Sequence, residues 1–182
     1  MFAEIRDRLR GRLAETGAAG IVLSTSDNVA YVTGYESVMD GWHLPEPIAA
    51  VFVPASKALP VTLFLPEASL IGLVVAEREG HAVAFERLRT FDLLNFCVTG
   101  RSEDVHLELA ADLQDQLQQL NTCVDGACAP TIVDSIVACL QSLSLTGDTV
   151  LFDDMRVALS ADKACGQLWA DGLDLMLAAR SI

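Results

Sequence analysis

Apolar residues recur along this chain with two different spacings, and these spacings predict where helices and strands form. Between Phe2 and Leu13 the apolar positions lie three or four residues apart, which is typical of an amphipathic helix. Short, mostly apolar runs instead predict buried strands. Such runs occur at 20–23, 48–53, 61–65 and 149–152.

The remaining pattern alternates between the two element types. It predicts a helical turn at 29–33, further helices at 66–80, 102–120, 130–143 and 160–169, and short strands at 81–86 and 173–178. The stretch 90–100 fits either a strand or a loop. Helices that alternate with strands predict an α/β fold with a mixed central β-sheet flanked by helices. The sheet is expected to be mixed because the runs at 48–53 and 61–65 lie close enough to form a hairpin.

Composition and charge narrow the class of protein. The chain of 182 residues has a net charge of -13, which disfavours nucleic acid and anionic membranes as partners. No apolar run approaches the roughly 18 residues that a membrane span needs. The first residues lack a secretory signal, and the five cysteines form no CxxC pair. We therefore expect a cytoplasmic protein with reduced, mostly buried thiols.

The sequence carries no recognisable catalytic signature. It has no phosphate-binding GxxxxGK[ST] loop, no GxGxxG fingerprint, no GxSxG elbow and no HExxH pair. The adjacent Asp153 and Asp154 follow a predicted strand, and we expect them to serve a turn and a helix cap. We therefore predict that these 182 residues hold no catalytic site and no metal or other cofactor.

One loop concentrates side chains that suit ligand binding. Asp40, Trp42 and His43 place a carboxylate, a large aromatic ring and an imidazole within four positions. Loops on a rigid scaffold often contact ligands. The alternative is that Trp42 folds back onto the sheet. These three residues are our candidates for a substrate-adjacent or interface role.

The stretch Ser26–Tyr35 resembles a signature of the N-terminal domain of the creatinase/prolidase/aminopeptidase P family. In that family an amphipathic helix and a short strand precede an Asn-x-x-Tyr-Leu/Val-Thr-Gly-Phe/Tyr segment. Here the segment begins at Asn28, and the matching positions include Tyr31, Thr33 and Gly34. The resemblance implies that residues 1–172 form the N-terminal domain. Residues 173–182, with Arg180-Ser181-Ile182, resemble the start of the connection to a C-terminal catalytic domain.

The resemblance also implies a role. The parent protein would be a metallopeptidase-type hydrolase, an Xaa-Pro dipeptidase or aminopeptidase, with two divalent metal ions held by its C-terminal domain. This part would be non-catalytic. It would contact that catalytic domain, contribute to a homodimer and supply Asp40, Trp42 and His43 to the edge of the substrate site. Two alternatives remain open: a domain of a creatinase-like or ectoine-hydrolase-like enzyme, and a free-standing α/β module that binds a small molecule.

Overall fold

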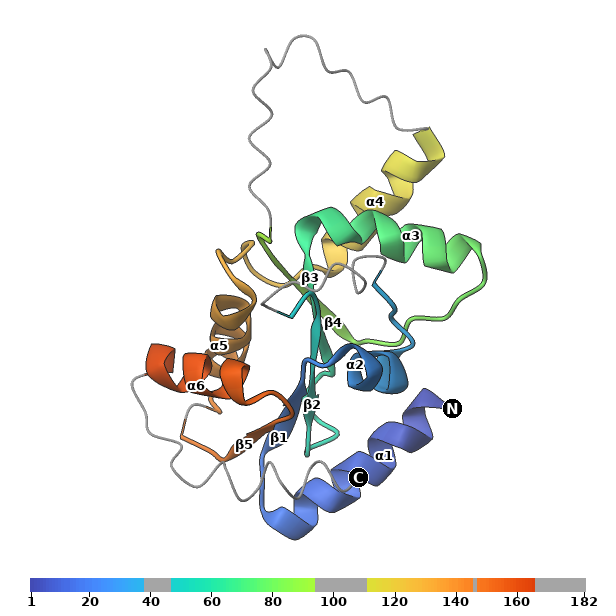
Figure 1. Cartoon of the computed structure of the whole chain (residues 1–182). Coiled ribbons are helices and arrows are strands. Elements are labelled where there is room, and N and C mark those ends of the chain that lie inside the picture. The colour runs from blue at the N-terminus through green and yellow to red at the C-terminus, as the bar shows by residue number, and fades with distance from the viewer. Residues whose placement is uncertain (38–46, 94–110, 146, 166–182) are drawn as a thin grey trace.

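The computed structural model describes residues 1–37, 47–93, 111–145 and 147–165 (Figure 1). Five strands form one sheet in the order β4-β3-β2-β1-β5. The elements in chain order are α1 (Phe2–Thr16), β1 (Gly20–Leu23), α2 (Ser26–Thr33), β2 (Ala50–Pro54), β3 (Thr62–Pro66), the 3₁₀ helix η2 (Glu67–Ser69), α3 (Leu70–Arg78), β4 (Arg87–Phe91), α4 (Ala111–Cys123), α5 (Ile132–Ser142), β5 (Val150–Phe152) and α6 (Met155–Cys165).

The sheet is mixed, as the sequence predicts. Strand β2 runs antiparallel to both β1 and β3, so β2 and β3 form the expected hairpin. The β1–β5 and β3–β4 pairs are parallel. Both parallel partners lie at the edges of the sheet. The fold is therefore an α/β domain in which a central antiparallel meander is extended by one parallel strand on each side.

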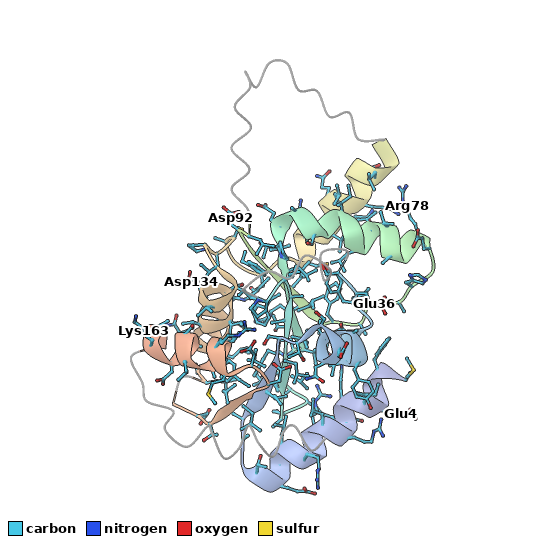
Figure 2. All side chains as sticks on the ribbon, viewed as in Figure 1. Glu4, Glu36, Arg78, Asp92, Asp134 and Lys163 are labelled. Atoms are coloured by element: carbon cyan, nitrogen blue, oxygen red, sulfur yellow. The ribbon has the colours of Figure 1, made fainter. Side chains whose placement is uncertain are left out.

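Helices cover both faces of this sheet and make three layers (Figure 1). Alternate residues of each strand point to opposite faces. On β1, Ile21 and Leu23 join the buried cluster under α1, α2 and α3, whereas Val22 joins the cluster under α5 and α6. Figure 2 shows side chains between the sheet and the helices, with the charged residues Asp134 and Lys163 at the periphery.

The strand expected at 81–86 is wrong, because the strand lies further along, at Arg87–Phe91. In the sequence, Arg87 and Arg89 obscure the apolar pattern of this strand. Arg89 is only 8% exposed, and its guanidinium donates to Asp125 at 2.7 and 3.2 Å. The ion pair makes burial of that charge tolerable. Residues 81–86 form instead a partly buried connection between α3 and β4.

Two helix starts also differ from expectation. Helix α6 begins at Met155, so Ser160 lies inside it and Asp154 is its N-cap, with Oδ1 accepting from the Arg156 backbone N–H at 2.8 Å. This confirms the capping role expected for Asp154. Helix α2 is longer than the single turn expected and begins at Ser26.

Some expectations lie outside the described residues: the helix start near 102, the strand at 173–178 and the domain boundary near 172. The described thiols are not mostly buried as expected. Cys139 is buried, whereas Cys123, the last residue of α4, and Cys128, within the α4–α5 connection, are exposed. No helix in the described ranges combines the length and the apolar character that crossing a bilayer requires.

Candidate functional site

A buried carboxylate joins the carboxyl ends of the two parallel strands β1 and β5. Asp153 directly follows β5 and is 9% exposed. Its Oδ1 accepts from the backbone N–H and the hydroxyl of Ser24, at 2.7 and 3.0 Å. Its Oδ2 accepts from the backbone N–H and hydroxyl of Thr25, at 3.1 and 2.8 Å, and from the Asn28 amide at 2.9 Å. Five donors therefore converge on one carboxylate.

These hydrogen bonds suit Asp153 to positioning the chain rather than to proton transfer. Each oxygen of Asp153 is already occupied by two or three donors, so little acceptor capacity remains for a reacting group. The bonds fix the turn from β1 into α2, because Ser24 and Thr25 form that turn and Asn28 lies in the first turn of α2. The expectation of a simple turn role for Asp153 therefore understates what it does, since its partners belong to another strand and helix.

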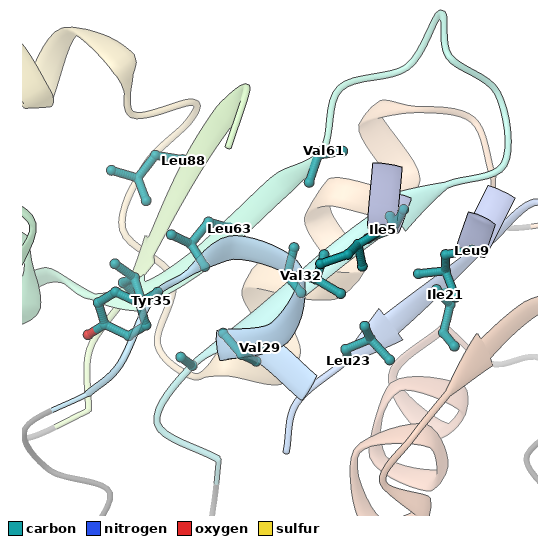
Figure 3. Packing of buried hydrophobic residues seen from close by; sticks show 14 of the residues in the cluster. Ile5, Leu9, Ile21, Leu23, Val29, Val32, Tyr35, Val61, Leu63 and Leu88 are labelled. Carbon is teal, nitrogen blue, oxygen red and sulfur yellow. The ribbon is translucent and has the colours of Figure 1, made fainter. Parts of the chain in front are cut away.

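Next to this cluster, a groove of about 680 Å³ runs between α1, β1 and α2. Its apolar floor consists of Ile5, Leu9, Ile21, Leu23 and Val32, which are all labelled in Figure 3. Its polar wall contains Arg8, Arg12 and Glu15 of α1, together with Asn28 and Tyr31 of α2. An apolar floor with a few polar groups around it is the usual character of a binding site.

The four motif residues gather on α2 and its C-terminal turn. Asn28 and Tyr31 line the groove, and the Tyr31 hydroxyl, on a side chain that is 54% exposed, accepts from the Arg8 guanidinium at 3.2 Å. Thr33 is buried; its hydroxyl donates to the Val29 carbonyl at 2.6 Å and accepts from the Tyr35 N–H at 3.0 Å. Thus two motif residues face the groove, and the other two shape the chain that leaves α2.

Gly34 is required by this turn for two reasons. Its φ of 77° lies in the left-handed region that disfavours side chains. A Cβ there would also lie 2.6 Å from the Phe2 ring and 2.7 Å from the Ala82 carbonyl oxygen. The close approach lets the end of α2 pack directly against α1 and the 81–86 connection.

Arg6 is a further structural residue that sequence reasoning missed. Its guanidinium donates to the Val32 carbonyl oxygen at 3.3 Å and to the Ala84 carbonyl oxygen. Arg6 is 7% exposed, and this burial lowers the pKa of its guanidinium, although the nearby Glu86 carboxylate opposes the effect. A signal existed in the sequence, because Arg6 lies beside Ile5 and Leu9 on the buried stripe of α1.

The three loop candidates, Asp40, Trp42 and His43, lie outside the described residues. The described chain on either side of them is anchored, since Tyr35 and Ile48 are 6% and 7% exposed. Within the described ranges, no three His, Cys, Asp or Glu side chains gather closely enough to hold a metal ion. What the described groove offers chemically is binding: two arginines, the Glu15 carboxylate, the Asn28 amide and the Tyr31 hydroxyl lie around an apolar floor.

Comparison with solved structures finds similar folds among creatinase/prolidase N-terminal domains, the family that the Asn28–Tyr35 segment resembles. That domain of an X-Pro dipeptidase from Streptococcus pyogenes is 18% identical, with a TM-score of 0.34, over 69% of this chain and 98% of the other. The N-terminal domain of a cytoplasmic peptidase, PepQ, from Mycobacterium tuberculosis is 16% identical, with a TM-score of 0.28, over 76% and 96%. A prolidase from Thermococcus sibiricus is 10% identical, with a TM-score of 0.32, over 79% of this chain and 36% of the prolidase. No protein-family model and no curated protein sequence matches the chain.

Proposed function

We propose that this chain is the non-catalytic N-terminal domain of an Xaa-Pro dipeptidase- or aminopeptidase-type hydrolase. In this role it supports dimerisation and presents residues 38–46 at the edge of the substrate site. The observation that best supports this proposal is the position of two residues of the family motif. Thr33 and Gly34 fix the turn after α2, and the chain then enters the segment with Asp40, Trp42 and His43 from the buried Tyr35.

Anchoring at both ends matters for a loop that contacts substrate. A segment that starts and ends at buried residues has fewer conformations to lose when it binds. Tyr35 is buried before the segment, and Ile48 and Ala49 are buried after it, at the start of β2. The Asp153 cluster adds a second constraint, because it fixes the N-terminal end of α2.

The proposal assigns hydrolysis to another domain of the parent protein. The two divalent metal ions that the family resemblance implies do not fit the described residues, which offer no suitable group of ligands. No step of catalysis is therefore assigned to this chain. Its contribution is to binding, and interactions made equally in the bound substrate and the transition state alter KM rather than kcat.

Kinetics of the protein in its full natural length test the proposal. We expect turnover of Xaa-Pro peptides and no turnover of creatine or ectoine. Trp42→Ala and His43→Ala should each raise KM by about tenfold, which corresponds to about 1.4 kcal/mol of lost binding. His81→Ala is the matched control, because His81 is exposed on the connection after α3 and its imidazole lies 3.9 Å from the Glu79 carboxylate.

The outcomes separate the alternatives. Turnover of creatine or ectoine instead of the peptide would assign the parent to those hydrolases. Absence of all three activities would favour a free-standing binding module. Unchanged KM in both loop variants would remove their substrate-adjacent role, and a monomer in sedimentation equilibrium would remove the role in dimerisation.

A further inference from the structure

The groove lies where the chain leaves two parallel strands in opposite directions. Strands β1 and β5 are parallel neighbours, so their carboxyl ends meet at one end of the sheet. Helix α2, which follows β1, packs on the α1 side of the sheet, whereas α6, which follows β5, packs on the α5 side (Figure 1). In open α/β sheets, connections that diverge in this way leave a crevice beyond the strand ends, and ligands commonly bind there. Thr25, Asn28 and Asp153, which follow these two strand ends, line the groove.

The groove also has the size and the floor of a small-molecule site. Its volume of about 680 Å³ falls within the range of roughly 300–1,000 Å³ that is usual for ligand pockets. The floor residues Leu9, Ile21 and Val32 come from three different elements and belong to the buried core (Figure 3). Because core packing holds these side chains in place, a ligand meets an apolar surface that is already formed.

Arg8 gives the groove a cationic wall. Its guanidinium donates to the Tyr31 hydroxyl at 3.2 Å, and no carboxylate of the described residues lies within ion-pair distance of it. Arg12 lies one helical turn further along α1 and is paired with Glu15 at 2.9 Å. Like charges four residues apart on a helix repel each other. An anion bound beside Arg8 relieves this repulsion and accepts from guanidinium N–H groups that Tyr31 leaves free.

The Asp153 cluster determines which way an anionic ligand points. Asn28 donates to Asp153, whereas Tyr31, one turn later on α2, accepts from Arg8. The acidic and the cationic groups therefore lie at different positions along α2. A carboxylate on the ligand is repelled by Asp153 and attracted by Arg8, so its place is beside Tyr31, with the rest of the ligand over the apolar floor.

We propose that this groove binds a small monocarboxylate with an apolar body. The carboxylate accepts from the Arg8 guanidinium, and the body covers the floor between α1 and α2. The Tyr31 hydroxyl and the Asn28 amide offer further hydrogen bonds along the same wall. This inference is independent of the hydrolase role proposed above, because it uses no residue of the 38–46 segment.

Calorimetric titration of the 182-residue chain with octanoate tests the proposal. We expect saturable binding of one molecule per chain. Hexanoate should bind about tenfold more weakly, because it buries two fewer methylene groups. Octylammonium has the same apolar body and the opposite charge, and it should bind more weakly than octanoate. This comparison is stringent because the net charge of -13 attracts cations to the chain in general.

Two pairs of variants locate the site. Arg8→Met should weaken octanoate binding about tenfold, since it removes charge-assisted hydrogen bonds. Arg78→Met is its matched control, because Arg78 is also an exposed arginine on a helix but does not line the groove. Gly11→Phe should abolish binding by filling the groove, since Gly11 lines it and a Cβ there meets open space. Gly72→Phe should leave binding unchanged, because Gly72 meets open space on α3, outside the groove.

Each of four results would overturn the proposal. Absence of saturable octanoate binding would mean that the groove takes no such ligand. Octylammonium binding as tight as that of octanoate would show that the carboxylate is not recognised. Equal weakening in Arg8→Met and Arg78→Met would assign the effect to net charge alone. Unchanged binding in Gly11→Phe would place the ligand elsewhere on the chain.

Discussion

The two faces of the sheet differ in how completely their layers are filled. Under α5 and α6 the core contains four phenylalanines, one from each of β2, β3, β4 and β5, each at most 2% exposed: Phe52, Phe64, Phe91 and Phe152. Under α1 and α2 the core is mainly aliphatic, and it borders the 680 Å³ groove. The first face is typical of a layer built for stability, because large rings bury much area and fill space. The second leaves room for a ligand or for another segment of chain.

Replacing the same residue type on each face should give the largest effects and test this difference. Leu140 of α5 is 0% exposed in the aromatic layer, and Leu9 of α1 is 6% exposed at the groove floor. We expect Leu140→Ala to lower the free energy of unfolding by about 4 kcal/mol and Leu9→Ala by about 2.5 kcal/mol. The cavity at Leu140 is enclosed, whereas the one at Leu9 opens into existing space.

Urea unfolding of both variants, followed by far-UV circular dichroism, measures this pair. The two leucines lose the same atoms from the same type of element, so each serves as the other's control. Equal losses would mean that the α1 side is as closely filled as the α5 side, and the contrast between the faces would disappear.

Replacing Asp153, at the polar end of the groove, should give the next largest loss of stability. Asp153→Asn keeps the shape of the side chain but replaces one accepting oxygen by an amide that opposes the Thr25 or Ser24 donors. We expect a loss of about 3 kcal/mol in the free energy of unfolding, since charged acceptors make the stronger hydrogen bonds and stranded donors are costly.

Asp148→Asn is a suitable control for this substitution, because Asp148 is exposed just before the same strand. Hydrogen exchange adds a local readout: the amides of Ser24 and Thr25 should lose protection in Asp153→Asn alone. A loss below about 0.5 kcal/mol, the range of ordinary surface substitutions, would contradict a positioning role for Asp153.

Local patterns in the sequence sufficed for most of the fold. Helix α1, the β2–β3 hairpin and α5 follow from apolar spacing alone, because each places its apolar residues on one buried face. Strand β4 did not follow, because the buried Arg89 is balanced by Asp125, which lies 36 positions away. A partner so distant leaves no trace in the local pattern.

The candidate site was less accessible to such reasoning. Asn28 and Tyr31 entered through a family resemblance, and the structure places both at the groove. The role of the Asp153 carboxylate could not be predicted in this way, because Asp153 lies 125 positions from Asn28 and 129 positions from Ser24 in the sequence. The groove itself arises where α1, α2 and β1 meet, which no single stretch of sequence encodes.

The smallest expected change in stability concerns Asp154, the N-cap of α6, which covers the closely filled face of the sheet. The Asp154 pKa lies below its usual range because its carboxylate accepts from the Arg156 guanidinium, chiefly, and from backbone N–H groups. A carboxyl with a lowered folded-state pKa stabilises the fold above its unfolded pKa of about 3.9, and this contribution is lost as pH falls through the folded value.

We therefore expect Asp154→Ala to lower the free energy of unfolding by about 1 kcal/mol at pH 7, and the difference from wild type should shrink toward pH 2. Because the Arg156 side chain is 70% exposed, Arg156→Ala should cost less than the cap itself. A difference between wild type and Asp154→Ala that stays constant from pH 7 to pH 2 in thermal unfolding would mean that the carboxylate charge does not contribute to the cap.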